Sequence, residues 1–314
     1  MRNNFIATLM NLAAENQKIW LLCGDLGYSV LEPFAKKFPD RFLNIGVAEQ
    51  NMAGVAAGIA LEGNTVFIYS IGNFPTFRCL EQIRNDICYH GADVKVVAVG
   101  AGYAYGSQGY THHALEDVAI MSALPGMEVF VPCDPVETRV ATRLIAASGR
   151  PSYLRLSRAG EPVLNPVEPP DLRQPRALRA GTDVVILASG PIVSACIVAA
   201  EELALEGTDA GVVSVTCVKP FDETFLRNDV SDARLLVTVE EHILRGGVYA
   251  AVSQSVAKFN RHPPVLGLGI PEPAGKISLA GDRETLLNAI GLSATGIADK
   301  IRKALQEMRV APLS

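Results

Sequence analysis

The sequence predicts an α/β protein with a doubly wound, mainly parallel-sheet domain followed by a smaller α/β domain. Short apolar runs, many rich in β-branched residues, alternate with longer segments of helical period, the pattern of a parallel sheet covered by helices. Runs such as Val94–Val99 are almost continuously apolar, as strands buried on both faces are. A proline-rich stretch interrupts the alternation, which restarts beyond it. These observations together predict the fold class.

The first predicted domain spans residues 1–160. Its strands are expected at the short apolar runs Ile19–Cys23, Thr65–Tyr69, Val94–Val99, Val129–Val131 and Ser152–Arg155. Helical periodicity predicts helices at Phe5–Asn16, Glu49–Leu61, Phe77–Tyr89, Leu115–Ala123 and Pro135–Ala147. Because helices separate the strands along the chain, neighbouring strands can run parallel.

A connector at residues 161–180 separates the two domains. It contains Pro162, Pro166, Pro169, Pro170 and Pro175, and this density of prolines disfavours both helix and sheet. The second domain, residues 181–314, is predicted to contain strands at Asp183–Leu187, Gly211–Val215, Leu235–Val239 and Val265–Leu268. Its helices are expected at Ile192–Glu206, Gly247–Lys258 and Glu284–Ala289.

Composition restricts the classes of partner. The formal net charge is -5 and the basic residues are scattered, which argues against nucleic acid or an acidic membrane as a partner. No apolar run reaches the roughly 20 residues of a spanning helix. The six cysteines are dispersed without C-x-x-C spacing, so we expect reduced thiols in a cytoplasmic protein. A small molecule or another protein is the expected partner.

Glu49 begins a predicted helix with an unusually small face. Small residues occupy much of that helix: Ala53, Gly54, Ala56, Ala57, Gly58 and Ala60. Another helix or a bound group can therefore approach the backbone of this helix closely. An acid in the first turn also complements the helix dipole, and such acids are common, so position alone favours a purely structural role for Glu49.

The chain around Glu49 resembles the glutamate motif of the transketolase family, which includes deoxyxylulose-phosphate synthases and the beta subunits of 2-oxoacid dehydrogenases. The resemblance continues in family order over nearly all of the first domain. It is carried by residues 45–52, 69–78, 81–84, 109–112, 124–127, 132–137 and 155–158. Residues 239–242 and 246–247 are similar to the family's C-terminal domain.

The resemblance implies a thiamine diphosphate site in which Glu49 is catalytic. Glu49 would hydrogen-bond a ring nitrogen of the aminopyrimidine and favour the imino tautomer that deprotonates the thiazolium carbon. A dry pocket suits this acid, because desolvation makes its proton available. Phe74 and Phe77 match the aromatic residues that wall the pyrimidine, although either alone is more often a core residue. Ile45 lies in the same motif and is a further cofactor contact.

His112 matches the family histidine that lies over the thiazolium and contacts the donor's oxygen atoms, so the resemblance implies a catalytic role. The loop before it, Gly100–Gly109, could be mistaken for the dinucleotide fingerprint of an oxidoreductase. Such a fingerprint opens a helix at once, whereas no helix is predicted here before Leu115. No cysteine or carboxylate at suitable spacing accompanies His113, so no metal site is predicted in this chain.

The family's diphosphate-binding elements have no counterpart in this sequence. Transketolases hold the diphosphate and Mg²⁺ with a Gly-Asp-Gly element and a downstream Asn pair on an N-terminal domain. Gly24-Asp25-Leu26 is not that element, and the only Asn pair, Asn3-Asn4, lies upstream. The resemblance therefore implies a separate diphosphate-binding N-terminal subunit that holds most of the Mg²⁺ coordination. We expect an α2β2 heterotetramer in which this chain also self-associates through the helix after Glu49.

Four further residues are candidate substrate contacts: Gln108, Arg158, Ser29 and Asp25. Gln108 stands where sugar-phosphate transketolases carry an Asp that contacts a donor hydroxyl. Of the family's phosphate clamp, only Arg158 and Ser29 remain. Because arginine binds phosphate by charge and paired hydrogen bonds, losing its partners weakens recognition of the phosphate end. The predicted acceptor is therefore not a simple aldose phosphate but a larger modified or nucleotide-linked sugar.

The predicted function is transfer of a two-carbon ketol unit from a ketose to an aldehyde or modified-sugar acceptor, with sugars or sugar phosphates as substrates. Two alternatives stay open. One is a 2-oxoacid dehydrogenase beta subunit, which would use a pyruvate-like donor. The other is a non-catalytic homologue that binds and regulates the partner chain, since fold alone does not settle function.

Overall fold

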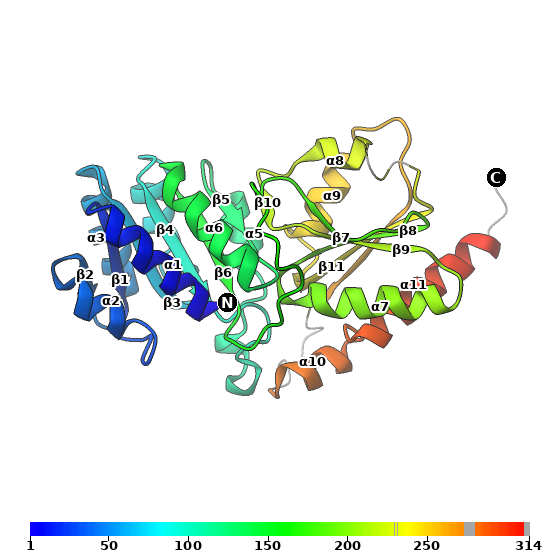
Figure 1. The fold of residues 1–314 in the computed structure, drawn as a ribbon, viewed down its shortest axis with the longest axis horizontal. Helices are drawn as coiled ribbons and strands as arrows, with labels where there is room; N and C mark the ends of the chain where they lie inside the picture. The colour runs from blue at the N-terminus through cyan, green and yellow to red at the C-terminus, as the bar shows by residue number, and fades with distance from the viewer. Residues whose placement is uncertain (229, 231, 273–279, 311–314) are drawn as a thin grey trace.

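The computed structural model describes residues 1–228, 230, 232–272 and 280–310. Figure 1 shows two α/β halves side by side, each with helices on both faces of a twisted sheet. All but one strand in each sheet run parallel to their neighbours. The predicted fold class is confirmed.

The first sheet contains seven strands in the described residues, in the order β10-β5-β6-β4-β3-β1-β2. Their bounds are β1 (Ile19–Cys23), β2 (Phe42–Asn44), β3 (Thr65–Ile71), β4 (Val94–Val99), β5 (Glu128–Phe130), β6 (Ser152–Leu156) and β10 (Cys217–Lys219). β10 follows three strands of the second sheet along the chain, yet it pairs antiparallel with β5 at the edge of the first. The two halves therefore share a sheet.

Alternate residues of the first sheet enter two different cores. Leu22, Ile68 and Val96 face one side, where they pack with Met52 and the alanines of α3 (Glu49–Leu61). Their chain neighbours, among them Phe67 and Val97, face α1 (Arg2–Glu15) and α6 (Pro135–Ser148) on the other side. The remaining helices of this half are α2 (Glu32–Lys37), α4 (Leu80–Gln82) and α5 (Asp117–Ala123).

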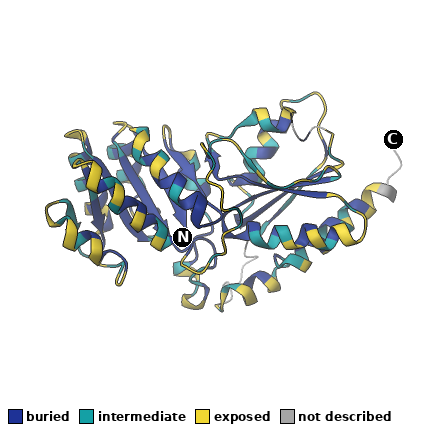
Figure 2. Ribbon diagram, in the orientation of Figure 1, coloured by how far each residue is buried: buried dark blue, intermediate teal, exposed yellow. Residues whose placement is uncertain are grey.

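The second sheet has the order β12-β11-β8-β9-β7 in the described chain. Its strands are β7 (Arg176–Arg179), β8 (Val184–Ser189), β9 (Ala210–Ser214), β11 (Leu235–Ile243) and β12 (Val265–Ile270). Its helices are α7 (Val193–Leu205), α8 (Glu223–Asn228), α9 (Val248–Val256), α10 (Arg283–Ala289) and α11 (Ala294–Val310). Figure 2 shows both sheets buried beneath helices whose outer faces are exposed.

Several segments differ from the sequence-based expectations. The end of the proline-rich connector forms β7, which pairs antiparallel with β9. The helix expected at Phe77–Tyr89 begins at Leu80 and continues as a π-helix over Ile83–Cys88. α11 was not predicted, although Ile297 and Ile301 on its inner face are fully buried.

A buried polar group joins the two halves. Arg155 of β6 forms an ion pair with Asp117 of α5, with 2.8 Å between Nε and Oδ2. The same guanidinium donates to the carbonyl of Glu241 in β11, and the hydroxyl of Tyr153 donates to Asp117. A buried arginine is stable only when its charge and its N–H groups are satisfied, and these partners fix how the halves pack.

Candidate active site

Glu49 is the first residue of α3, and its side chain is 1% exposed. It lies against Gly24, which follows β1. A Cβ at Gly24 would stand 3.4 Å from Cγ of Glu49, already in contact with it, so a longer side chain there would displace the carboxylate. The end of β1 and the start of α3 thus place one carboxylate in a buried position beside the sheet.

Arg78 is the residue that sequence reasoning missed. Its Nη1 donates to Oε2 of Glu49 at 2.8 Å, and its side chain is 46% exposed. We expected an acid in a dry pocket, and the structure adds an ion pair with Arg78. The charge of Glu49 also contributes, after burial, to raising the pKa of the neighbouring Cys79 thiol to about 12, so this cysteine stays protonated.

Phe74 and His112 continue the same chain of contacts. The Arg78 guanidinium lies over the Phe74 ring, with 4.6 Å from Cζ to the ring centroid. The rings of Phe74 and His112 meet edge to face, with 5.3 Å between centroids and 70° between planes. We call Glu49, Arg78, Phe74 and His112 the Glu49 cluster. Three of its four members were predicted site residues.

The other two predicted cofactor residues lie differently. Phe77 is 36% exposed and makes no ring contact within the described residues. Of the two predicted phenylalanines, Phe74 is the one that belongs to the Glu49 cluster. Ile45 packs its side chain on the core beneath α3, and its N–H donates to the carbonyl of Cys23 at the end of β1.

His112 is carried by a loop held at several points. The loop forms two 3-10 turns, Gly106–Gln108 and Tyr110–His112, and no helix begins before α5, so it is not a dinucleotide fingerprint. The side-chain amide of Asn73 donates to the carbonyl of His113 at 2.7 Å. His113 itself is fully buried, with Nε2 3.0 Å from the carbonyl oxygen of Gly106, which is a structural role.

The second half of the chain also holds this loop. The carboxylate of Glu241 lies against Gly102, where a Cβ would overlap the Glu241 side chain. Gly102 has a φ of +59°, so both its conformation and the close approach favour glycine. Arg283 of α10 donates to both oxygens of Glu241.

The predicted substrate residues are only partly brought together. Asp25 follows Gly24, and its carboxylate accepts a hydrogen bond from Asn44 at 3.0 Å. Asp25 and Ser29 both have left-handed backbones, with φ of +54° and +62°, so they shape one tight turn close to Glu49. Gln108 is exposed on the His112 loop, and its side chain makes no hydrogen bond in the described chain.

Arg158 lies elsewhere. Its guanidinium is 5.0 Å from the Tyr105 ring centroid, and it makes no ion pair within the described residues. It lines a pocket of about 300 Å³ together with Arg283, Ser157 and Ser194, between the two halves of the chain. No contact joins Arg158 directly to the Glu49 cluster in the described part of the chain.

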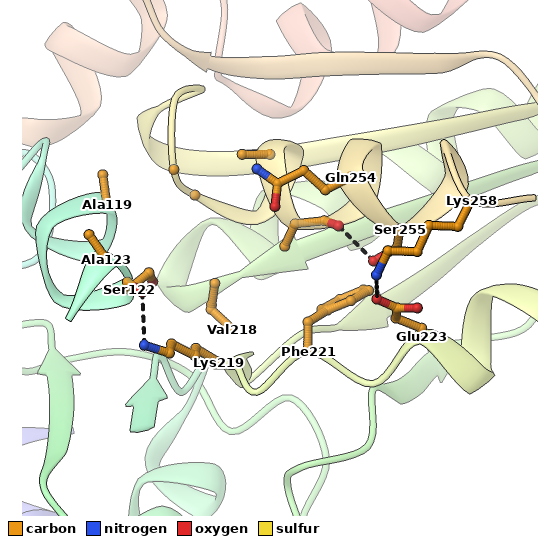
Figure 3. Close-up of a pocket in the computed structure, with 14 residues that line it drawn as sticks. Ala119, Ser122, Ala123, Val218, Lys219, Phe221, Glu223, Gln254, Ser255 and Lys258 are labelled. Atoms are coloured by element: carbon orange, nitrogen blue, oxygen red, sulfur yellow. Dashed lines mark hydrogen bonds and ion pairs between the residues drawn. The ribbon is translucent and has the colours of Figure 1, made fainter. Parts of the chain in front are cut away.

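A larger pocket, of about 390 Å³, contains none of the predicted site residues. It lies between α5 and α9, with small residues such as Ala119 and Ala123 on its wall (Figure 3). Lys219 donates there to the carbonyl oxygen of Ser122, and Lys258 pairs with Glu223. Both lysines have partners within the protein, so pocket size does not identify the site here.

The residues present fit the pyrimidine end of thiamine diphosphate. A buried carboxylate can hydrogen-bond a ring nitrogen, and an adjacent phenylalanine offers an apolar face for a flat heterocycle. Across the described residues, no group of three or more His, Cys, Asp or Glu side chains could hold a metal ion. No described helix is long and apolar enough to span a membrane.

Comparisons with known proteins agree with this geometry. Residues 1–161 match the pyrimidine-binding domain of transketolase, and residues 174–297 match the transketolase C-terminal domain. A putative transketolase C-terminal section from Methanocaldococcus jannaschii is 35% identical over 98% of this chain and 96% of its own length. An apulose-4-phosphate transketolase subunit from Phocaeicola vulgatus is 35% identical, with 86% of this chain and 87% of the relative covered.

A solved structure has the same fold throughout. It is described as a split gene transketolase, inactive beta4 tetramer, and it superimposes with a TM-score of 0.86 at 36% identity. The match covers 97% of each chain. With its buried glutamate, its His112 loop and these matches over nearly its whole length, the chain belongs to the transketolase family.

Proposed function

We propose that this chain is the C-terminal, pyrimidine-binding subunit of a two-subunit, thiamine-diphosphate-dependent transketolase. The observation that carries the proposal is the buried carboxylate of Glu49 in contact, through Arg78 and Phe74, with the histidine of the His112 loop. A single acid, an aromatic face and an imidazole are the groups that such an enzyme requires from this half. Relatives that match end to end and are themselves named as sections or subunits support a separate chain.

Each residue of the site has a proposed role. Glu49 shares a proton with a ring nitrogen of the aminopyrimidine, while Phe74, Phe77 and Ile45 hold the ring in place. Bound thiamine diphosphate supplies the electron sink needed to break and form a carbon–carbon bond beside a carbonyl. We assign to His112, which contacts Phe74 and is partly buried, the donation of hydrogen bonds to the oxygen atoms of a ketose donor.

A partner chain completes the proposed site. The diphosphate and Mg²⁺ carry charges that require cations and several oxygen ligands, whereas the Glu49 cluster contains one carboxylate, which is already paired with Arg78. We assign these contacts to an N-terminal transketolase subunit. The relative from Phocaeicola vulgatus is named as one subunit of a transketolase, and the split-gene structure is described as an inactive tetramer of beta chains. These names support both a partner and self-association.

The surface of α3 is the proposed self-contact in an α2β2 heterotetramer. Its alanines point into the core, but Gly54 and Gly58 have nothing within 4 Å of where a Cβ would stand. Leu61 at the end of the same helix is 57% exposed. Outward glycines one helical turn apart allow another helix to approach closely.

We also propose a cytoplasmic location, because all six cysteines are buried and none forms a disulfide.

The proposed acceptor is a modified sugar rather than a simple aldose phosphate. Gln108 presents a neutral amide to solvent beside His112, where a carboxylate would select a different hydroxyl pattern. Arg158 stands away from the Glu49 cluster, so it does not form a compact phosphate clamp with it. Asp25 and Ser29 are proposed to contact the sugar from the turn after Gly24.

Donor cleavage by this chain, with and without the partner chain, tests the proposal. Thiamine diphosphate, Mg²⁺ and a panel of ketoses and 2-oxoacids are supplied to each. We expect ketose turnover only when both chains are present, and near-complete loss of turnover in Glu49→Gln with the complex still assembled. Turnover by this chain alone would refute the two-subunit arrangement, and turnover of 2-oxoacids alone would indicate a dehydrogenase beta subunit. Cofactor binding without any turnover would indicate a regulatory homologue.

A further inference from the structure

Arg78 makes two contacts at once with the Glu49 cluster. Its guanidinium donates a hydrogen bond to the carboxylate of Glu49 at 2.8 Å, and its Cζ lies over the Phe74 ring, 4.6 Å from the ring centroid. A guanidinium is planar, cationic and rich in N–H donors, so one group can hydrogen-bond an acid and stack on an aromatic ring.

These are the two contacts that the proposed function gives to the aminopyrimidine, which is also a flat, nitrogen-bearing group. Phe74 is in addition met edge-on by His112, so two groups already contact its ring. A pyrimidine that stacks on Phe74 where the guanidinium now lies therefore requires Arg78 to move. We propose that Arg78 competes with the aminopyrimidine for Glu49 and Phe74, and so sets the affinity of the assembled enzyme for thiamine diphosphate. This inference rests on the proposed function.

Arg78 is the member of the cluster that can leave. Its side chain is 46% exposed, whereas that of Glu49 is 1% exposed. Glu49 is the one acid with which Arg78 pairs in the described chain, and a half-exposed ion pair is a weak restraint because water can replace it. The arginine side chain can rotate toward solvent while Glu49 stays fixed at the start of α3.

The competition also explains why a cation stands beside the acid. A buried carboxylate without a partner is unfavourable, so Arg78 satisfies Glu49 until the pyrimidine takes over the hydrogen bond. The apparent dissociation constant of a ligand rises when its site is competent for only part of the time. If Arg78 holds Glu49 for about nine-tenths of the time, removing the guanidinium tightens cofactor binding about tenfold.

Calorimetric titration of thiamine diphosphate into the assembled two-subunit complex, with Mg²⁺ in excess, tests this competition. We expect Arg78→Met to bind the cofactor about tenfold more tightly than the wild type. Arg84→Met is the matched control, because Arg84 is an exposed arginine on the same segment whose side chain hydrogen-bonds only to its neighbour Asn85 within the described residues. The control should bind like the wild type. Equal or weaker binding by Arg78→Met would show that Arg78 supports the cofactor site instead of competing for it.

Thermal unfolding gives a second readout that does not depend on turnover. Without cofactor, Arg78→Met should unfold at a lower temperature than the wild type, because Glu49 loses its partner. Saturating thiamine diphosphate should then raise the unfolding temperature more in the variant than in the wild type. Arg78→Lys keeps the positive charge but loses the planar guanidinium. It is the variant to measure if Arg78→Met does not fold. Its affinity should fall between those of wild type and methionine variant, and an unchanged or weaker affinity counts against the competition.

Failure of the inference and failure of the proposed function give different results. A wild-type complex that does not bind thiamine diphosphate would refute both. Wild-type binding that Glu49→Gln weakens, together with unchanged or weaker binding in Arg78→Met, would refute the competition and leave the function intact.

Discussion

The carboxylate of Glu241 accepts a hydrogen bond from the backbone N–H of Tyr103 at 2.7 Å, across 138 positions of sequence. Tyr103 lies in the loop that carries His112, and Glu241 lies in β11 of the second sheet. The side chain of Glu241 is 1% exposed and also holds Arg283. The second half of the chain therefore fixes the position of a residue in the site formed by the first.

Glu241→Gln should loosen this connection. The amide can still accept from Tyr103, but it leaves Arg283 without its counter-charge, so the free energy of unfolding should fall by about 2 kcal/mol. Turnover of the complex should fall as well, because His112 is held less firmly. Urea unfolding and steady-state kinetics measure the two effects. Glu272→Gln, which alters an exposed pair with Arg245, should change neither, and a Glu241 variant that behaves like this control would contradict the anchoring role.

Asp117→Asn should be one of the most damaging single changes in the first half. Asp117 and Arg155 are both buried, and removing the acid leaves an uncompensated arginine between the two halves. We expect a loss of about 4 kcal/mol in the free energy of unfolding, measured with urea. Asp299→Asn breaks a surface pair with Arg302 and should cost less than about 1 kcal/mol. Similar losses in the two variants would mean that the buried pair contributes little.

His242 predicts a dependence of stability on pH. Burial lowers the pKa of His242 to about 4 from its ordinary 6.5. The unfolded chain therefore takes up a proton near pH 6.5 and the folded chain only near pH 4, so acid between these values favours unfolding. Above pH 6.5 this contribution is fully present. It is lost as the pH falls toward 4, by about 3 kcal/mol in total.

The comparison with His242→Asn isolates this contribution. Glu240, 3.7 Å away, has a pKa that burial raises to about 8, and so it contributes a trend of opposite sign in the wild type. Glu240 is present in both proteins. Subtracting the free energy of unfolding of the wild type from that of His242→Asn therefore removes the Glu240 contribution to a first approximation. Relative to the wild type, His242→Asn should become more stable as the pH drops from 6.5 to 4. A difference between His242→Asn and the wild type that does not change with pH would disprove the prediction.

Alanine substitutions of Phe74 and Phe77 should affect stability and cofactor binding differently. Phe74→Ala removes a ring held by Arg78 and His112, so it should lower both the unfolding temperature and the affinity for thiamine diphosphate. Phe77→Ala removes a ring that is 36% exposed, so the unfolding temperature should hardly change. If Phe77 walls the pyrimidine, calorimetry should still show up to about tenfold weaker binding. An unchanged affinity in Phe77→Ala would remove this residue from the site.

Local patterns predicted most of the fold. α3 occupies the predicted residues 49–61, and β1 and β4 also match, because each is a long or strongly apolar run with clear ends. Short elements were missed. β2 and β10 contain three residues each, too few for any periodicity, and β10 is a strand only because β5 of the other half offers it an edge.

The sequence predicted which residues belong to the candidate site, but it did not predict which of them contact one another. The motif placed Glu49, Phe74 and His112, and the structure brings these three into one cluster. The Arg78–Glu49 pair joins residues 29 positions apart, and no spacing rule in the sequence pairs a strand-to-helix turn with the start of another helix. Arg158 shows the converse, since a motif position did not bring that residue into the cluster.

The pairing of β10 with β5 also bears on how this protein can be divided. A chain cut in the proline-rich connector would leave β5 as a bare edge, free to pair with other molecules, and the cut would divide a hydrophobic core built from both sides. Such fragments would be aggregation-prone when produced alone. A chimera that takes its second half from a relative would need β10 and its partner strand β5 to come from the same protein. The two halves therefore form one structural unit, even though two domain families describe them.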